Sequence, residues 1–105
     1  MSPGRRHCPP ILASEGLRVQ LMKDAIGRHP LYGTLGEPVT RRVLMHVVVN
    51  RQGGVAWVGL TQPSGDTFVD EVAPQIVSQL RFHPLLLDGT AYDARFRYDM
   101  SFVIE

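Results

Sequence analysis

The last fifteen residues, AYDARFRYDMSFVIE (91–105), decide the fold class of this chain. From Tyr92 to Ile104, apolar or aromatic side chains alternate with polar ones, and this period of two is typical of a β-strand with one buried face. The sequence therefore predicts that the chain ends in one long strand. The residues predicted to point inward are Tyr92, Ala94, Phe96, Tyr98, Met100, Phe102 and Ile104, and those predicted to point outward are Asp93, Arg95, Arg97, Asp99 and Ser101.

Two further strands are predicted in the middle of the chain. The segment VLMHVVVN (43–50) is apolar at both odd and even positions, which is typical of an interior strand with most of both faces covered. The turn NRQGG (50–54) offers Gly53 and Gly54, which accept positive φ angles. VAWVGLT (55–61) then completes a β-hairpin.

A first helix is predicted over residues 15–27. Ser14 precedes it, and we expect this side chain to accept hydrogen bonds from the first-turn N–H groups. Gly27, as a left-handed residue, and then Pro30 are expected to end the helix.

A second helix is predicted from about Thr67, with apolar residues every four positions as far as Leu80. Ser64 and Gly65 stand before Asp66, in a pattern typical of a helix N-cap. Pro74 lacks an N–H group, so we expect either a regular helix that begins only near Val72 or a kinked one.

The element order is helix-strand-strand-helix-strand, which predicts an α+β fold. A hairpin followed by a right-handed helical crossover favours a three-stranded antiparallel sheet of order 2-1-3 with the helices packed on one face. The last strand is then at the edge of the sheet. Its thirteen residues, 92–104, are expected to extend beyond an eight-residue central strand.

Composition limits the remaining choices. The chain has 105 residues, 44% of them hydrophobic, which fits a single domain over 14–105 after a proline-containing tail or linker over 1–13. A net charge of +1 gives no field for gathering nucleic acid. One cysteine, Cys8, excludes an internal disulfide, and no apolar run approaches the roughly 18 residues of a membrane helix.

The sequence offers no catalytic or metal-binding pattern. His7, His29, His46 and His83 lack ligand spacing. The acids at the start of the second helix, Asp66, Asp70 and Glu71, stand beside no base or nucleophile and complement the helix dipole. We therefore predict a non-enzyme without catalytic residues, metal or other cofactor.

Over its last 63 residues, 43–105, the chain resembles the C-terminal domain of the TonB family, which includes TolA-like domains. The resemblance consists of alternating apolar residues, a glycine turn, a Ser-Gly loop, an alanine-containing helix, an Arg-Phe-x-Pro exit and a glycine before the last strand. The chain departs from the family pattern at Arg41, Pro74 and Leu80. The residues that carry the resemblance are Val43, Met45, Val47, Val49, Gly53, Val55, Val58, Leu60, Ser64, Gly65, Val69, Asp70, Ala73, Val77, Arg81, Phe82, Pro84 and Gly89.

An edge strand presents unpaired N–H and C=O groups, to which an extended peptide can add as a further strand. The resemblance implies such capture of an envelope protein or peptide segment at the last strand. The expected partner-binding residues are Arg95, Arg97, Tyr98, Asp99, Ser101 and Val103. The alternative is an ordinary surface edge protected by its charged side chains.

The resemblance also implies a periplasmic domain of an inner-membrane-anchored protein. Through inner-membrane motor proteins, such a protein transmits energy of the proton-motive force to its envelope partner. Two alternatives remain: a passive binding module of a larger envelope or signalling protein, and a cytoplasmic regulatory domain if Met1 is the natural start. The same edge also allows pairing of two copies into a homodimer.

Overall fold

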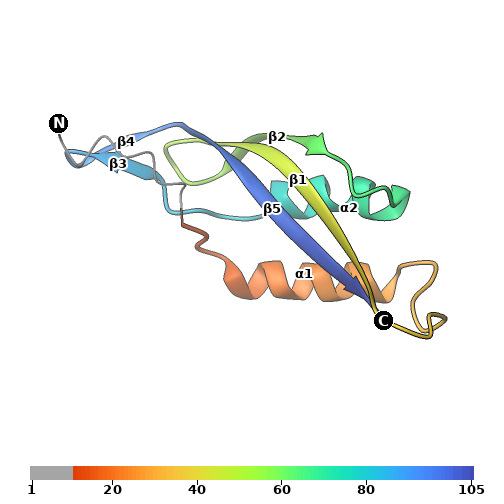
Figure 1. The fold of residues 1–105 in the computed structure, drawn as a ribbon. Coiled ribbons are helices and arrows are strands. Elements are labelled where there is room, and N and C mark those ends of the chain that lie inside the picture. The colour runs from red at the N-terminus through yellow and green to blue at the C-terminus, as the bar shows by residue number, and fades with distance from the viewer. Residues whose placement is uncertain (1–10) are drawn as a thin grey trace.

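The computed structural model describes residues 11–105 and has the predicted α+β architecture (Figure 1). Its main sheet has three antiparallel strands in the order β2-β1-β5, which confirms the predicted order and the edge position of the last strand. Residues 1–10, most of the predicted tail, lie outside the described residues. The elements are α1 (Glu15–Gly27), β1 (Val39–Val49), β2 (Val55–Gln62), α2 (Thr67–Ser78), β3 (Leu85–Leu87), β4 (Thr90–Tyr92) and β5 (Ala94–Ile104).

β1 and β5 pair along their whole length. Val39 lies opposite Ile104, Val49 lies opposite Ala94, and each strand has 11 residues. The expectation that the last strand extends beyond a shorter central strand is therefore wrong. β1 begins earlier than predicted because backbone groups of β5 near the C-terminus need partners, and residues 39–42 supply them.

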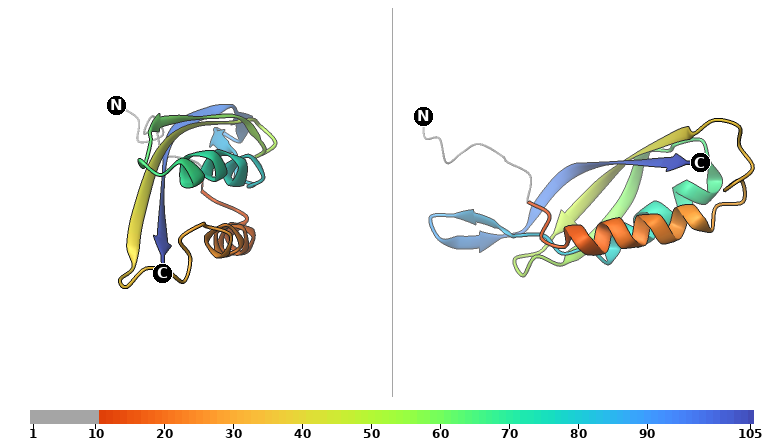
Figure 2. Two further views of the ribbon diagram at one scale, coloured as in Figure 1. Left: turned by 90° about the vertical axis from the view of Figure 1, so that its right-hand side faces the viewer. Right: turned by 90° about the horizontal axis from the view of Figure 1, so that it is seen from below.

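A small hairpin, β3–β4, precedes β5 and was not predicted. Asp88 and Gly89 form its two-residue turn with φ angles of 51° and 79°, as a type I′ turn requires. The hairpin extends beyond the body of the domain (Figure 2, right). Tyr92 belongs to β4 and is 46% exposed, so its predicted inward position is wrong.

The core lies between the sheet and the two helices, which cover the same face of the sheet (Figure 2). On the opposite face, Leu44, His46 and Val48 of β1 are only half-buried, so this face is less covered than predicted. β5 has the predicted alternation, with buried side chains at Ala94, Met100, Phe102 and Ile104 and half-buried ones at Phe96 and Tyr98. The buried residues of the other elements are Ala25, Val43, Met45, Val47, Val49, Val69, Val72, Ala73, Ile76 and Val77.

The ends of α1 differ from the prediction although its bounds do not. The Ser14 side chain makes no capping bond, because its hydroxyl instead accepts a hydrogen bond from the Arg81 N–H at 2.8 Å. Gly27 is still helical, and the C-cap, Arg28, has a right-handed φ of −95°. The expected capping bond from Ser14 and the expected left-handed conformation of Gly27 are therefore wrong. The hydroxyl of Ser14 instead ties the start of α1 to the chain after α2.

α2 begins at Thr67, so the expected later start near Val72 is wrong. The Asp66 carboxylate accepts a hydrogen bond from the Val69 N–H at 3.2 Å, which confirms a capped N-terminus in this loop. Ser64 adds to the cap, because its N–H and its hydroxyl both donate to the Asp70 carboxylate. Pro74 lies inside the helix, which ends at Ser78.

The β1–β2 turn packs against the exit from α2 through Gly53. Its φ is 86°, and its carbonyl accepts a hydrogen bond from the Phe82 N–H at 2.9 Å. A Cβ at this position would lie 2.1 Å from the Phe82 carbonyl oxygen. Gly53 is therefore required both by the turn and by this close approach.

We predict that Gly53→Ala lowers the free energy of unfolding by more than about 2 kcal/mol, because backbone strain and steric overlap act together. Gly65→Ala is the matched control. Gly65 has a φ of 90° but no neighbour within 4 Å of a Cβ, so its substitution should cost only about 1 kcal/mol. Urea unfolding of the three proteins measures this, and equal losses in both variants would contradict the close approach at Gly53.

Candidate functional site

The candidate site is the side of β5 that faces away from β1. In the three-stranded sheet, β5 has β1 as its one neighbour. The first step is to establish which backbone groups of β5 face outward. In an antiparallel sheet, successive residues of a strand direct their N–H and C=O groups to opposite sides.

The β1–β2 turn fixes this alternation. The Asn50 N–H donates to the Gly54 carbonyl, and the Asn50 carbonyl accepts from the Gly53 N–H, so the backbone groups of Asn50 face β2. Both register shifts between β1 and β2 place the extra residue in β2, which leaves the alternation of β1 unbroken. Val49, Val47 and the other odd-numbered residues of β1 therefore direct their backbone groups towards β5.

The register between β1 and β5 then shows which backbone groups of β5 bond to β1. Val47 lies opposite Phe96, so the even-numbered residues of β5 bond to β1 and the odd-numbered ones direct N–H and C=O away from it. We call the odd-numbered residues the edge row. Within residues 11–105, their backbone groups make no hydrogen bond to a turn, loop or helix end. The edge row consists of Arg95, Arg97, Asp99, Ser101 and Val103.

The side chains of the edge row share the sheet face opposite the helices, and all of them are exposed. Five of the six predicted partner-binding residues thus form one continuous row. Tyr98 is placed differently: its ring is half-buried on the helix side, in edge-to-face contact with Phe82 and near Phe96. Its backbone groups face Met45 of β1.

Charge along the edge row is unevenly compensated. Arg42 of β1 donates to Asp99 through Nε at 2.8 Å and also through Nη2. This hydrogen bonding lowers the pKa of Asp99 and raises that of Arg42. Within the described residues, no carboxylate lies within 4 Å of Arg95 or Arg97. The edge row therefore has two uncompensated positive charges followed by a neutralised negative one.

The face beside the edge row carries one large exposed aromatic side chain. Trp57 is 56% exposed, and its ring lies over Gly59, where a Cβ would be only 2.5 Å away. The ring is also near His46, at 6.3 Å between centroids. His46 lies opposite both Gly59 and Arg97, so Trp57 and the edge row flank the central strand on the same open face.

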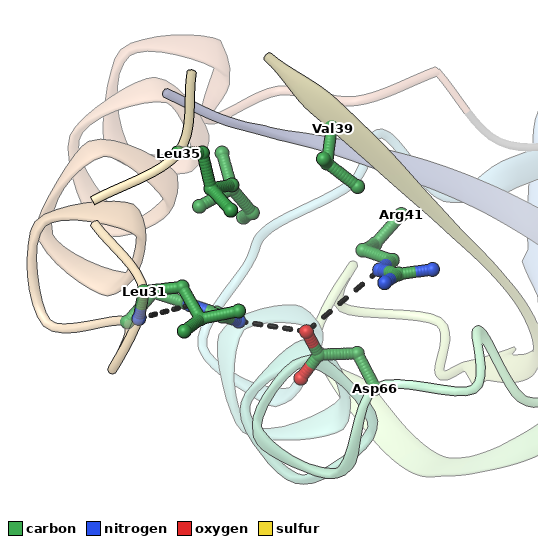
Figure 3. Close-up of a pocket in the computed structure, with 7 residues that line it drawn as sticks. Leu31, Leu35, Val39, Arg41 and Asp66 are labelled. Carbon is green, nitrogen blue, oxygen red and sulfur yellow. Dashed lines mark hydrogen bonds and ion pairs between the residues drawn. The ribbon is translucent and has the colours of Figure 1, made fainter. Parts of the chain in front are cut away.

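A second cluster surrounds a small cavity of about 50 Å³, which Val39 of β1 and Ile104 of β5 help to line (Figure 3). Nε2 of the buried His29 is 2.7 Å from Asp66, and its Nδ1 accepts a hydrogen bond from the Leu31 N–H at 3.0 Å. Because Nδ1 accepts, the ring proton is on Nε2 and points at the carboxylate. Both ring nitrogens are thus engaged within the fold, and neither has a lone pair free for a substrate.

Asp66 joins three parts of the chain. It caps α2, bonds to His29 in the loop after α1, and lies 3.9 Å from Nε of Arg41 in β1. Burial alone would raise the pKa of Asp66, but hydrogen bonds from His29 and the Val69 N–H bring it below its ordinary value. This cluster holds the helices against the sheet. Sequence reasoning missed it because its members are far apart in the chain.

Comparison with known proteins adds no relative: no protein-family model matches the chain, and no curated protein matches it at a significant level. Among residues 11–105, no helix is long and apolar enough to cross a membrane. The same residues hold no group of three or more His, Cys, Asp or Glu side chains placed to bind a metal ion. The functional proposal therefore rests on the edge row and on the sequence resemblance.

We predict that Asp66→Asn destabilises the domain by about 1–3 kcal/mol at neutral pH, because a hydrogen-bonded carboxylate is lost. The folded-state pKa of Asp66 lies below its unfolded value, so its charged form stabilises the protein above the unfolded pKa near 3.8. That contribution disappears as the pH falls through the folded-state pKa. Denaturant unfolding of both proteins between pH 7 and pH 2 should show a difference that shrinks in acid, and a constant difference would contradict this role.

Proposed function

We propose that this domain captures an extended segment of a cell-envelope partner, which adds as a fourth strand beside β5. The observation that carries the proposal is the edge row, whose residues direct both hydrogen-bonding groups away from β1. A strand that adds there gains main-chain hydrogen bonds at every second residue of β5. The resemblance to TonB family domains, which are understood to capture a receptor segment at this strand, supports the same function.

β5 suits this function because it is held rigidly before any partner arrives. All 11 of its residues pair with β1, and Met100, Phe102 and Ile104 are at most 2% exposed. A preorganised edge loses little conformational entropy when a peptide binds. The charged side chains of the edge row discourage indiscriminate pairing with other exposed strands, and this leaves room for selectivity.

We further propose that the domain belongs to a periplasmic, inner-membrane-anchored protein that transmits proton-motive-force energy through motor proteins to its partner. The resemblance over 43–105 supports this role. A peptide added along β5 is also suited to it, since a pull along the strand loads its main-chain hydrogen bonds together. A passive binding module would use the same edge, and a transmembrane helix with a proline-rich spacer upstream in the full-length gene product would favour the coupler.

We predict that Ser101→Pro weakens peptide binding about tenfold relative to Ser101→Ala. Proline removes the outward N–H, and one hydrogen bond contributes roughly 1 kcal/mol or slightly more. Both variants lose the same hydroxyl, so their difference isolates the backbone donor. Ser101 is exposed and at an edge, where proline is tolerated, and unfolding curves check that both variants are folded.

The probe for this measurement is a peptide selected against the parent protein from a displayed library of random nine-residue sequences. Fluorescence polarisation then gives its dissociation constant for each variant. Equal binding by Ser101→Pro and Ser101→Ala would show that the edge N–H is not used. If the library yields no peptide that binds at β5, strand addition itself is contradicted.

A further inference from the structure

This inference rests on the proposed function, the capture of an extended segment by β5. The charges of the edge row then determine which side chains that segment carries. We infer that the captured segment is acidic, with carboxylate side chains at two alternate positions beside Arg95 and Arg97 and an apolar side chain beside Val103. The inference rests on which charges are already compensated within the domain and which are not.

Within the part of the chain that the structure describes, the positive charges at the start of the edge row have no carboxylate within 4 Å. Arg95 and Arg97 are exposed, and their neighbours across the sheet, Val48 and His46, carry no negative charge. Asp93, just before β5, lies 3.9 Å from Arg51. Within residues 11–105, the charge available to a guest strand at this end of β5 is therefore positive.

The other end of the edge row has a different character. Asp99 is held by Arg42 and offers no free negative charge to a basic guest side chain. Ser101 is uncharged, and Val103 is 42% exposed, an apolar surface without cover among the described residues. From its first residue to its last, the edge row thus presents two cationic side chains, a carboxylate neutralised by Arg42, a hydroxyl and an apolar side chain.

The geometry of a β-sheet shows which positions of the captured segment, here called the guest strand, lie beside each edge-row residue. An added strand places alternate side chains on the same face as the edge row, with Cβ atoms about 5 Å from their lateral neighbours. Carboxylates at guest positions i and i+2 then lie beside the arginines, and position i+8 lies beside Val103, about 26 Å along the strand. These positions apply to a guest strand parallel to β5, and an antiparallel guest strand carries the same side chains in the reverse order. Lysines at the first two positions would face like charges, which is unfavourable.

The test uses end-capped ten-residue peptides of threonine with valine at position 10 and Glu, Gln or Lys at positions 2 and 4, each also made in the reverse order. For the parent protein, we expect the Glu peptide of the favoured order to bind about fivefold more tightly than the Gln peptide. This matches two exposed ion pairs. The Lys peptide should bind more weakly still, and 0.5 M NaCl should reduce these differences.

A charge-reversed variant with both Arg95→Glu and Arg97→Glu provides the decisive comparison. We expect it to invert the order, so that the Lys peptide binds most tightly, and this binding also shows that the variant is folded. A variant with Arg95→Gln and Arg97→Gln should bind all three peptides with similar affinity. If the charge-reversed variant still prefers the Glu peptide, the inference is wrong.

The outcomes separate this inference from the proposed function. If the Glu, Gln and Lys peptides bind the parent protein equally at low salt, strand capture stands and the acidic preference is overturned. If no peptide of either order binds at any charge, the proposed function fails and the acidic preference fails with it.

Discussion

The pairing of β1 with β5 is the constraint on which the rest of the structure depends. Its register runs without a shift from Val39 and Ile104 to Val49 and Ala94. A slip of one residue would move Met100 and Phe102 out of the core and the arginines into it, so burial holds the register firmly. In a strand, the direction of the backbone groups and the face of the side chain alternate together. The same register therefore directs the N–H and C=O groups of the edge row away from β1 and its side chains to the face opposite the helices. The core therefore determines the candidate site.

The contacts that tie the elements together and the residues of the candidate site lie on opposite faces of one sheet. On the helix side, Asp66 connects α2 to His29 and Arg41, and Gly53 connects the β1–β2 turn to Phe82. On the open side, Arg42 with Asp99, Trp57 and the edge row take little part in the core. Substitutions on the open face are thus expected to leave the domain folded. This separation makes charge reversal at Arg95 and Arg97 an experiment on binding.

The sequence predicted those features of the fold that depend on neighbouring residues. The alternation of residues 94–104 gave the two faces of β5, and the hairpin and crossover gave the strand order. The β3–β4 hairpin was missed although Asp88-Gly89 is a strong turn signal between apolar residues. Other features depend on contacts between distant residues and left no local signal. The start of β1 at Val39 depends on its partner Ile104, and the hydroxyl of Ser14 is used by Arg81, 67 residues away. Asp99 was predicted as an edge residue, but its neutralisation by Arg42 required the register.

Backbone amide hydrogen exchange along β5, followed by NMR in the free protein, tests the central claim most directly. We expect rapid exchange at Arg95, Arg97, Asp99, Ser101 and Val103, whose N–H groups face solvent. The intervening N–H groups of Phe96, Tyr98, Met100 and Phe102 should be protected to the level of the β1 core, because they donate to β1. Uniform protection along the whole strand would mean that the outer side is already occupied, and it would contradict this account.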